Sequence, residues 1–473
     1  MVPADSGGGV MRTDLLTEDL SGLAEALAAV DAFDRVLVDG LLRPGAAQAE
    51  GLAVLTRAVS GSPLAARVAQ AAEKAAAGGG GEDDFVALAA ARAALLGAVH
   101  DALMERVGEA TGREPSGVDF PAQEPEGAAN VLAAARSWLA DLARTGWRGL
   151  DHEAVSASAP VVTALLADPA LRRLAALLDG FAAELAASCP GATVEQFPVR
   201  RWADLWARAL LLTVPGAGAV AGAEPVTGRL LPLGVDLQEH ATAVQAQVHA
   251  VFEPADGSPS RLVRASVSAA KPDTVVGAGL WQLLRPHMSL LAAVGEGRAM
   301  ELTGMPLTAE GDLLWDDVHA KSGEPADALT TARVALPAAT GPLTAPLDRH
   351  PARLAVPVFL EGYAAETEDA DTVTFDVAGG RLAVDVDRIP AAGPLTPKAV
   401  AASRACIGLL RWDAGEFRLQ PLAVETLVRK KPVGVQAGAW AGGSTDKAGV
   451  KAEKAATDAA TVLRERAGRL LRK

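Results

Sequence analysis

Cysteine is almost absent from this chain: Cys189 and Cys406 are the only two in 473 residues. Two cysteines exclude a disulfide framework and a Cys-rich zinc site. Both lie in apolar sequence surroundings, so we expect two buried thiols in a reducing cytoplasm, and one bridge between them stays open as the alternative. The N-terminal residues lack the charged-then-apolar layout of a signal peptide, which also predicts a cytoplasmic protein.

Long apolar runs and aromatic side chains are also scarce. No window reaches about 18 uninterrupted apolar residues, the length of a membrane-spanning helix, so no membrane partner is expected. Aromatic residues make up 4% of the chain, with Tyr363 as its one tyrosine. Abundant alanine and an excess of arginine over lysine indicate a GC-rich bacterial genome. The length predicts two or three domains.

The chain has little positive charge, and that charge is unevenly distributed. The formal net charge is −14, which argues against a nucleic-acid partner because such proteins need a basic footprint. Residues 429–473 nevertheless contain eleven basic and four acidic residues, a net charge of +7, which leaves −21 on residues 1–428. The sequence therefore predicts an acidic body with a basic tail.

Catalytic signatures are missing as well. The sequence contains no Walker lysine loop, His-Glu-x-x-His, Gly-x-Ser-x-Gly or Cys-x-x-Cys, so no cofactor is predicted. Asp316, Asp317 and His319 are weak candidates for metal ligands, but a metal needs a further convergent ligand, and a polar loop or helix start is the competing interpretation.

A second weak group of polar residues lies in the part of the chain with strand-like alternation. Asp236, Glu239 and His240 fall at a predicted turn between two strands, and His249 follows on the polar face of the second strand. Turns are common positions for acid–base groups. These four residues are the candidate catalytic site of an alternative hypothesis, a hydrolase or transferase, and a solvated turn is the competing interpretation.

The apolar period changes once along the chain, from helical spacing to alternation, which predicts an α+β fold. We expect a disordered N-terminus at 1–13, an all-helical domain at 14–215 and a mainly antiparallel β domain at 225–431. A glycine-rich linker at 432–445 and a basic amphipathic helix at 446–473 complete the predicted organisation. Further strands are expected at 332–336 and 354–361.

Two hairpins are predicted within the β domain. Gly379-Gly380 has the composition of a two-residue hairpin turn, and counting outward from it pairs Val377 with Leu382, Phe375 with Val384 and Val373 with Val386. A second hairpin is expected to turn at residues 413–415.

The last predicted helix before the change of period, at 197–212, carries Trp202 and Trp206 one turn apart. This ridge is expected to pack the helical half onto the strand-rich half, and an exposed partner surface is the alternative. In the basic tail, Arg464, Arg466, Arg469 and Arg472 are candidate interaction residues. The tail has few large apolar residues, which favours docking on protein over insertion into a membrane.

The stretch Arg-Arg-Trp-Ala-Asp-Leu-Trp at 200–206 resembles uncharacterised bacterial proteins encoded beside MoxR-type AAA ATPases, von Willebrand A proteins and SWIM zinc-finger proteins. The resemblance implies an accessory subunit of a multi-protein system, with an AAA ATPase system as its partner. Together with the charged tail, it leads to our first hypothesis: a non-catalytic interaction or scaffold subunit that docks through the Trp-rich helix and the basic C-terminal helix.

Overall fold

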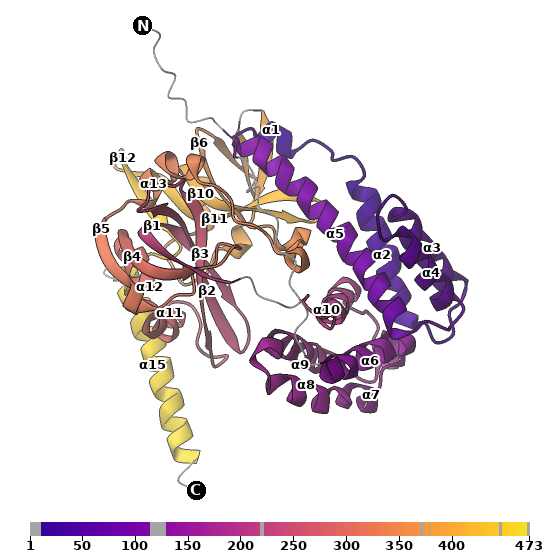
Figure 1. Ribbon diagram of the computed structural model, residues 1–473. Coiled ribbons are helices and arrows are strands. Elements are labelled where there is room, and N and C mark those ends of the chain that lie inside the picture. The colour runs from indigo at the N-terminus through magenta and orange to yellow at the C-terminus, as the bar shows by residue number, and fades with distance from the viewer. Residues whose placement is uncertain are drawn as a thin grey trace.

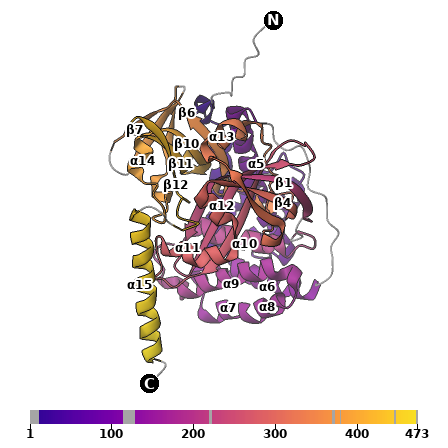
Figure 2. The same cartoon turned by 90° about the vertical axis from the view of Figure 1, so that its left-hand side faces the viewer.

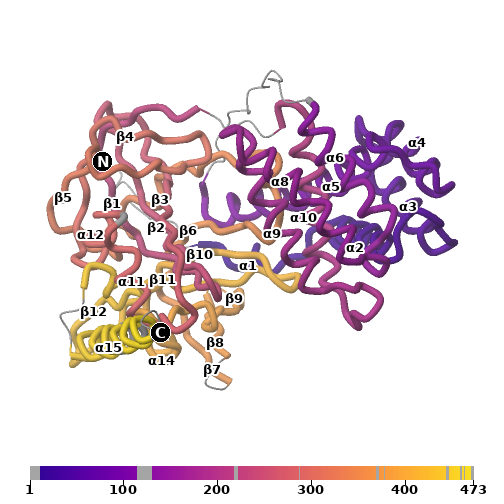
Figure 3. The backbone as a smooth tube through the Cα atoms, turned by 90° about the horizontal axis from the view of Figure 1, so that it is seen from below, coloured from indigo at the N-terminus to yellow at the C-terminus, as the bar shows by residue number. Residues whose placement is uncertain are grey.

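The computed structural model describes residues 11–113, 129–217, 222–368, 372–377, 379–443 and 447–470. It has the predicted α+β fold: helices come first, two largely antiparallel sheets follow, and one long helix ends the chain (Figure 1). The helical part and the sheets lie side by side (Figure 3).

Apolar residues at helical spacing form the first part of the chain. The 30-residue helix α5 begins after Gly81, whose N–H donates to the Asp84 carboxylate over 2.9 Å, and it ends at Gly112, which has a φ of 67°. These are the usual start and stop signals of a helix. The helices are α1 (Thr13–Leu16), α2 (Leu23–Asp39), α3 (Ala46–Ala58), α4 (Ala65–Ala76), α5 (Glu82–Thr111), α6 (Ala129–Thr145), α7 (His152–Ser156), α8 (Ser158–Leu166), α9 (Arg172–Ala187) and α10 (Val199–Leu212).

Helix α10 carries the tryptophan ridge into the core of the helical part. Trp202 and Trp206 are 2% and 0% exposed. The Trp206 indole N–H donates to the carbonyl of Leu139 over 2.9 Å, and its ring lies 6.2 Å from that of Phe33. The prediction that the ridge packs against the sheets is therefore wrong, because its partners are other helices. Burial also removes both tryptophans from the surface that a partner could contact.

The first sheet has the strand order β3-β2-β1-β4-β5, and its neighbouring strands are antiparallel. One face packs on two short helices that lie on either side of Pro286, a residue that disfavours a continuous helix. The elements are β1 (Glu224–Glu239), β2 (Ala243–Pro254), β3 (Arg261–Ala270), α11 (Gly279–Leu284), α12 (Leu290–Glu296), β4 (Arg298–Leu307) and β5 (Ala320–Pro325).

The second sheet has seven strands in the order β6-β10-β11-β9-β8-β7, and β12 also pairs with β11. The pair β9–β11 is parallel. Its elements are β6 (Val356–Glu361), β7 (Ala364–Thr367), β8 (Val373–Val377), β9 (Gly380–Val384), α14 (Pro397–Ala401), β10 (Ser403–Asp413), β11 (Glu416–Val428) and β12 (Lys431–Gln436).

A helix replaces one predicted strand. Residues 332–336 were expected to be extended, but α13 (Ala328–Val334) occupies most of this range. The Asp327 carboxylate caps this helix by accepting from the N–H of Thr330 over 2.7 Å. Ala328, Leu329 and Ala332 pack between residues of both sheets, so the cap and the burial together outweigh the strand-like pattern.

The β8–β9 hairpin is present, but its register differs from the predicted one. Val377 pairs with Gly380, Phe375 with Leu382, and Val373 with Val384. This is a shift of two residues, so the apolar side chains still share one face. Gly380 is the first residue of β9, and a Cβ there would lie 2.6 Å from the backbone of Thr13, so the close approach requires glycine. The second hairpin turns at Ala414 and Gly415, as predicted.

The chain from Met11 to Thr13 is ordered, although residues 1–13 were predicted to be disordered. The N–H of Arg12 donates to the carbonyl of Ala110 over 2.8 Å. The Thr13 side chain is buried and donates to the carbonyl of Val377. The predicted disorder at 1–10 lies outside the described residues.

The predicted glycine-rich linker at 432–445 is also packed as far as the structure describes it. It begins as strand β12, and a turn then places Trp440 in the core beneath the first sheet. The N–H of Ala437 donates to the carbonyl of Leu422 over 2.9 Å. A Cβ at Gly393 would overlap the backbone of Ala437, so the glycine here allows a close approach of two backbone segments. Residues 444–446 lie outside the described part.

Helix α5 belongs to two hydrophobic cores. Phe85 and Leu88 in its first half pack with the other helices. Leu103 and Val107 in its second half belong to the core of the second sheet, which also contains Phe375. The predicted boundary near residue 215 therefore marks a change of secondary structure along the chain, while α5 physically joins the two parts (Figure 1).

Candidate functional site

Asp236, one of the four candidate catalytic residues, lies in a buried polar cluster between the two sheets. It is 3% exposed. Arg411 Nη2 and Gln420 Nε2 donate to its two carboxylate oxygens over 2.8 and 2.7 Å, and Gln238 Nε2 donates over 3.0 Å. Burial lowers the pKa of Arg411, against the opposing effect of the Asp236 charge. These bonds occupy both oxygens of the carboxylate, so Asp236 joins the two sheets.

His249 lies beside this cluster on β2 and is 4% exposed. Burial lowers its pKa to about 4, against the charge of Asp236, while Arg264 and Arg411 lower it further. Its Nε2 has no hydrogen-bond partner among the described residues. The ring is therefore a neutral group enclosed between the sheets, and the predicted position on a polar, solvated strand face is wrong.

Glu239 and His240 do not join this cluster. Both are exposed at the end of β1. The Glu239 carboxylate lies 3.0 Å from Lys271 Nζ, and the N–H of His240 donates to the carbonyl of Ala243 over 2.8 Å. The structure thus brings together two of the four candidate catalytic residues and places the other two in a surface turn. The two that meet are enclosed, so the four do not form one open acid–base site.

The weak metal candidates each make separate local hydrogen bonds. Asp316 accepts from the N–H of Val318 over 3.0 Å, and Asp317 accepts from the Trp315 indole over 2.7 Å. His319 Nδ1 donates to the carbonyl of Thr303 over 2.8 Å. Partial burial acts to raise the pKa of Asp317, but the bonds it accepts lower it overall. These residues shape a loop, and across the described ranges no three His, Cys, Asp or Glu side chains are grouped to hold a metal ion.

A second buried charge cluster was not predicted from the sequence. Arg92 on α5 and Asp34 on α2 have side chains that are 3% and 0% exposed, and their two hydrogen bonds measure 2.7 and 3.0 Å. Arg92 also lies 3.5 Å from Asp204 on α10, which accepts from Arg208 over 3.0 Å. His350 Nε2 lies 3.5 Å from Asp204. The cluster connects three helices to the loop before β6.

One signal in the sequence could have identified this cluster. Arg92 interrupts an alanine-rich, apolar stretch of α5, and a charge within an apolar stripe requires a partner. The partner itself could not be found this way, because Asp34 lies 58 residues earlier. The buried carboxylate and guanidinium satisfy each other, so the cluster is a structural junction.

The basic C-terminal helix α15 (Lys447–Leu470) is docked on its own chain through its first half. Gln282 Nε2 on α11 donates to Thr457 Oγ1 over 3.0 Å. Arg285 forms an ion pair with Glu453, and it also donates to the carbonyls of Trp440 and Ala441 over 3.1 and 2.8 Å. These contacts fix the direction in which the helix leaves the body.

The second half of α15 projects away from the body (Figure 2). Arg464, Arg466 and Arg469 are exposed there, and Val462 is 46% exposed. Arg472 lies outside the described residues. An isolated helix of this length is marginal in water, so its continuity with the docked half supports it. The projecting part is an accessible basic surface that the body does not cover.

The two cysteines are free in the structure. Cys406 is buried, which raises the pKa of its thiol, whereas Cys189 is partly exposed. The expectation of two free thiols is confirmed, and burial of both is confirmed only for Cys406.

Comparison with models of protein families, with curated proteins and with solved structures gives no significant match. Helix α5 meets the length and hydropathy criteria for a membrane span within the described residues, and 56% of its most apolar window is buried. Core helices meet the same criteria, and α5 packs in two cores.

Proposed function

We propose that this chain is a non-catalytic interaction subunit of a bacterial multi-protein assembly, and that it docks on an acidic protein surface through the projecting half of α15. One observation carries the proposal: Thr457 and Glu453 anchor the helix to α11 and to Arg285 directly after it, and the helix then continues into solvent with three exposed arginines. An AAA ATPase system is the partner that the resemblance at 200–206 implies.

The chemistry of the projecting half favours an acidic protein as the partner. Its positive charge attracts acidic surfaces, whereas the body of the chain has a strong negative charge that repels phosphates brought close to it. In the sequence, the large apolar residues of this half and the residues after it are Val462, Leu463, Leu470 and Leu471, and none is aromatic, which provides little area for insertion between lipids. Ionic contacts at such a surface determine mainly the association rate and the salt dependence.

The experiment compares two triple variants of the full-length chain. The first replaces Arg464, Arg466 and Arg469 with glutamine. The matched control makes the same change at Lys447, Lys451 and Lys454, three exposed cations in the docked half of the same helix. Both variants lose the same charge, so a difference between them reports the position of the contact.

Tagged versions are recovered from the native cell, and partners are quantified at low and physiological salt. We expect the distal variant to lose its partners and the proximal variant to keep them. For the wild type, recovery should fall as salt rises, because the Debye length is about 8 Å at physiological ionic strength. Equal recovery with the wild type and the distal variant at both salt concentrations contradicts the proposal, and equal losses in the two variants show a general charge effect.

A further inference from the structure

The free edge of strand β12 presents backbone hydrogen-bonding groups to solvent. β12 pairs with β11 alone in the described part of the sheet. Val428 pairs with Lys431 across a two-residue turn, so residues 431, 433 and 435 direct their backbone groups toward β11. The backbone groups of Pro432, Gly434 and Gln436 therefore point away from β11.

The outward groups form a short hydrogen-bonding pattern with a defined spacing. Pro432 supplies a carbonyl, Gly434 supplies an N–H and a carbonyl, and Gln436 supplies an N–H, while the Gln436 carbonyl already accepts from Ala439 over 3.2 Å. No turn, loop or side-chain hydrogen bond among the described residues engages Gly434. An added antiparallel strand would pair with these four groups, with Gly434 at the centre.

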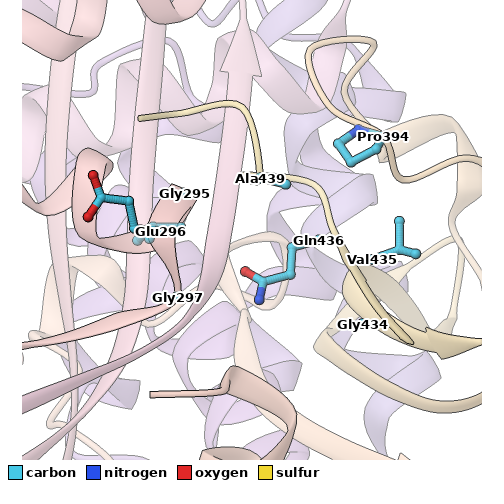
Figure 4. Close-up of a pocket in the computed structure, with 9 residues that line it drawn as sticks. Gly295, Glu296, Gly297, Pro394, Gly434, Val435, Gln436 and Ala439 are labelled. Atoms are coloured by element: carbon cyan, nitrogen blue, oxygen red, sulfur yellow. The ribbon is translucent and has the colours of Figure 1, made fainter. Parts of the chain in front are cut away.

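A groove of about 420 Å³ runs beside this edge. Gly434, Val435 and Gln436 form one wall, and the C-terminal end of α12 with its cap residue (Gly295–Gly297) forms the opposite wall (Figure 4). The Gln436 amide points toward the end of α12, whereas the Glu296 carboxylate points away from Gln436. Glycine in an edge strand allows another backbone to approach closely. The groove therefore offers space for a single extended chain along β12.

The charges around the groove indicate what kind of segment fits. Arg429, Lys430 and Lys431 form the tip of the β11–β12 hairpin and are exposed, and no ion-pair partner lies near them among the described residues. Arg429 and Lys430 have φ values of 51° and 66°, a conformation that glycine and asparagine adopt more readily. At the other end of the edge, Glu296 is exposed but points away from Gln436. The edge is thus basic beside Lys431.

We propose that the β12 edge binds an extended segment of a protein partner by antiparallel strand addition, with acidic residues immediately C-terminal to the paired stretch. Antiparallel addition places the C-terminal side of the segment beside the basic tip. Gly434 and Gln436 bind its backbone, and Arg429, Lys430 and Lys431 bind its carboxylates. This surface is separate from α15, so the proposal stands or falls independently of the function proposed above.

The backbone contribution is tested with the matched pair Gly434→Pro and Gly434→Ala in the full-length chain. Both add a Cβ, which meets Leu329 at 3.2 Å, but proline alone removes the outward N–H. The probe is a fluorescein-labelled peptide in which a Thr-Val-Thr-Val block precedes four aspartates, and binding is measured by fluorescence anisotropy. We expect saturable binding to the wild type and to Gly434→Ala, and a loss of about tenfold or more in Gly434→Pro.

The charge contribution is tested with the double variant Arg429→Asn and Lys430→Gly. Asn-Gly suits this turn better than the native pair, so the hairpin is retained while two positive charges are removed. The variant is expected to bind the probe about tenfold or more weakly, and the same peptide with its aspartate block at the N-terminal end is expected to bind the wild type more weakly than the probe.

Three results overturn the proposal. The first is an absence of saturable wild-type binding, and the second is equal affinity for Gly434→Pro and Gly434→Ala. The third is self-association of the wild type, measured by sedimentation velocity without peptide, that both the Gly434→Pro and the double variant abolish. That result would assign the edge to a second copy of this chain. A variant lacking residues 447–473 should bind the probe as the wild type does, which separates this surface from α15.

Discussion

The Arg92 guanidinium binds both carboxylate oxygens of Asp34, with Nε 2.7 Å from Oδ1 and Nη2 3.0 Å from Oδ2. Burial acts to lower the pKa of Arg92, but the Asp34 carboxylate more than offsets it and the pKa is raised. Both side chains are almost fully enclosed. Removing one of them would leave an uncompensated charge in the core of the helical part.

Asp34→Ala is therefore expected to lower the free energy of unfolding by about 3–5 kcal/mol, measured by urea denaturation. The control is Glu50→Ala, which removes the exposed ion pair with Arg57 and should cost less than about 1 kcal/mol. Replacing Asp34 and Arg92 together by leucine and methionine should recover much of the loss. Similar costs for Asp34→Ala and Glu50→Ala would contradict the assignment of a buried pair.

The burial of His249 predicts that the free energy of unfolding depends on pH. Its pKa is lowered from 6.5 to about 4, so the unfolded chain takes up a proton at a higher pH than the folded chain does. The stability of the fold with a neutral His249 is fully present above pH 6.5. It decreases by up to about 3 kcal/mol as the pH falls toward 4, because the unfolded chain binds the proton first. His249→Gln removes this contribution to the pH dependence.

The measurement compares urea denaturation of the wild type and His249→Gln at pH 7 and at pH 4.5. We expect the free energy of unfolding to fall more steeply for the wild type over this interval. His240→Gln, at the exposed turn, serves as the control and should keep the wild-type pH profile. Identical pH profiles for the wild type and His249→Gln would show that His249 is not enclosed in its neutral form.

The complete burial of Trp206 in α10 predicts that its removal strongly lowers the free energy of unfolding. Trp206→Ala removes a side chain that is 0% exposed and its hydrogen bond to Leu139. The free energy of unfolding is expected to fall by about 3–5 kcal/mol. Trp206→Phe keeps an aromatic ring and should cost less. An unchanged denaturation midpoint in Trp206→Ala, together with lost partner recovery, would instead assign the ridge to an exposed contact.

The close backbone approach at Gly393 is tested by substituting alanine. The added Cβ would overlap the carbonyl oxygen of Ala437 and lie 2.8 Å from the carbonyl carbon, so the backbone must shift. We expect a loss of about 1–3 kcal/mol in the free energy of unfolding. Gly341→Ala is the matched control, because no atom lies within 4 Å of its Cβ position. Equal denaturation midpoints for the two variants would restore the interpretation of 432–443 as a loose linker.

Local patterns in the sequence were sufficient to predict most helices and the α+β class. Spacing of apolar residues and capping groups acts within a few turns, as at Gly81 and Asp84. The misassigned elements depended on distant segments. Residues 432–443 have a linker-like composition, but their glycines allow close packing against residues such as Gly393. The β8–β9 hairpin contacts Thr13, a residue more than 360 positions earlier, which approaches Gly380 and donates to the carbonyl of Val377.

The candidate polar site shows the same limit. Asp236 was predicted at a turn and His249 on the strand after it, but the bonds from Arg411 and Gln420 to Asp236 connect positions 175 and 184 residues apart. Alternation within a strand does not specify which second sheet covers it. The sequence therefore suggested an open acid–base turn where the structure has an enclosed junction.

The position of α5 in two cores has a consequence for synthesis on the ribosome. Leu103 and Val107 share a core with a sheet whose first strand, β6, begins about 250 residues further along the chain. At about 5–20 residues per second, that sheet emerges roughly 12–50 s after α5 does. Throughout this interval the first half of the helix can pack with its neighbouring helices, whereas the second half can pack with α1 but lacks the sheet that completes its core. The nascent chain therefore exposes an apolar surface until the strands of the second sheet have emerged, and during this interval that surface most needs protection from aggregation.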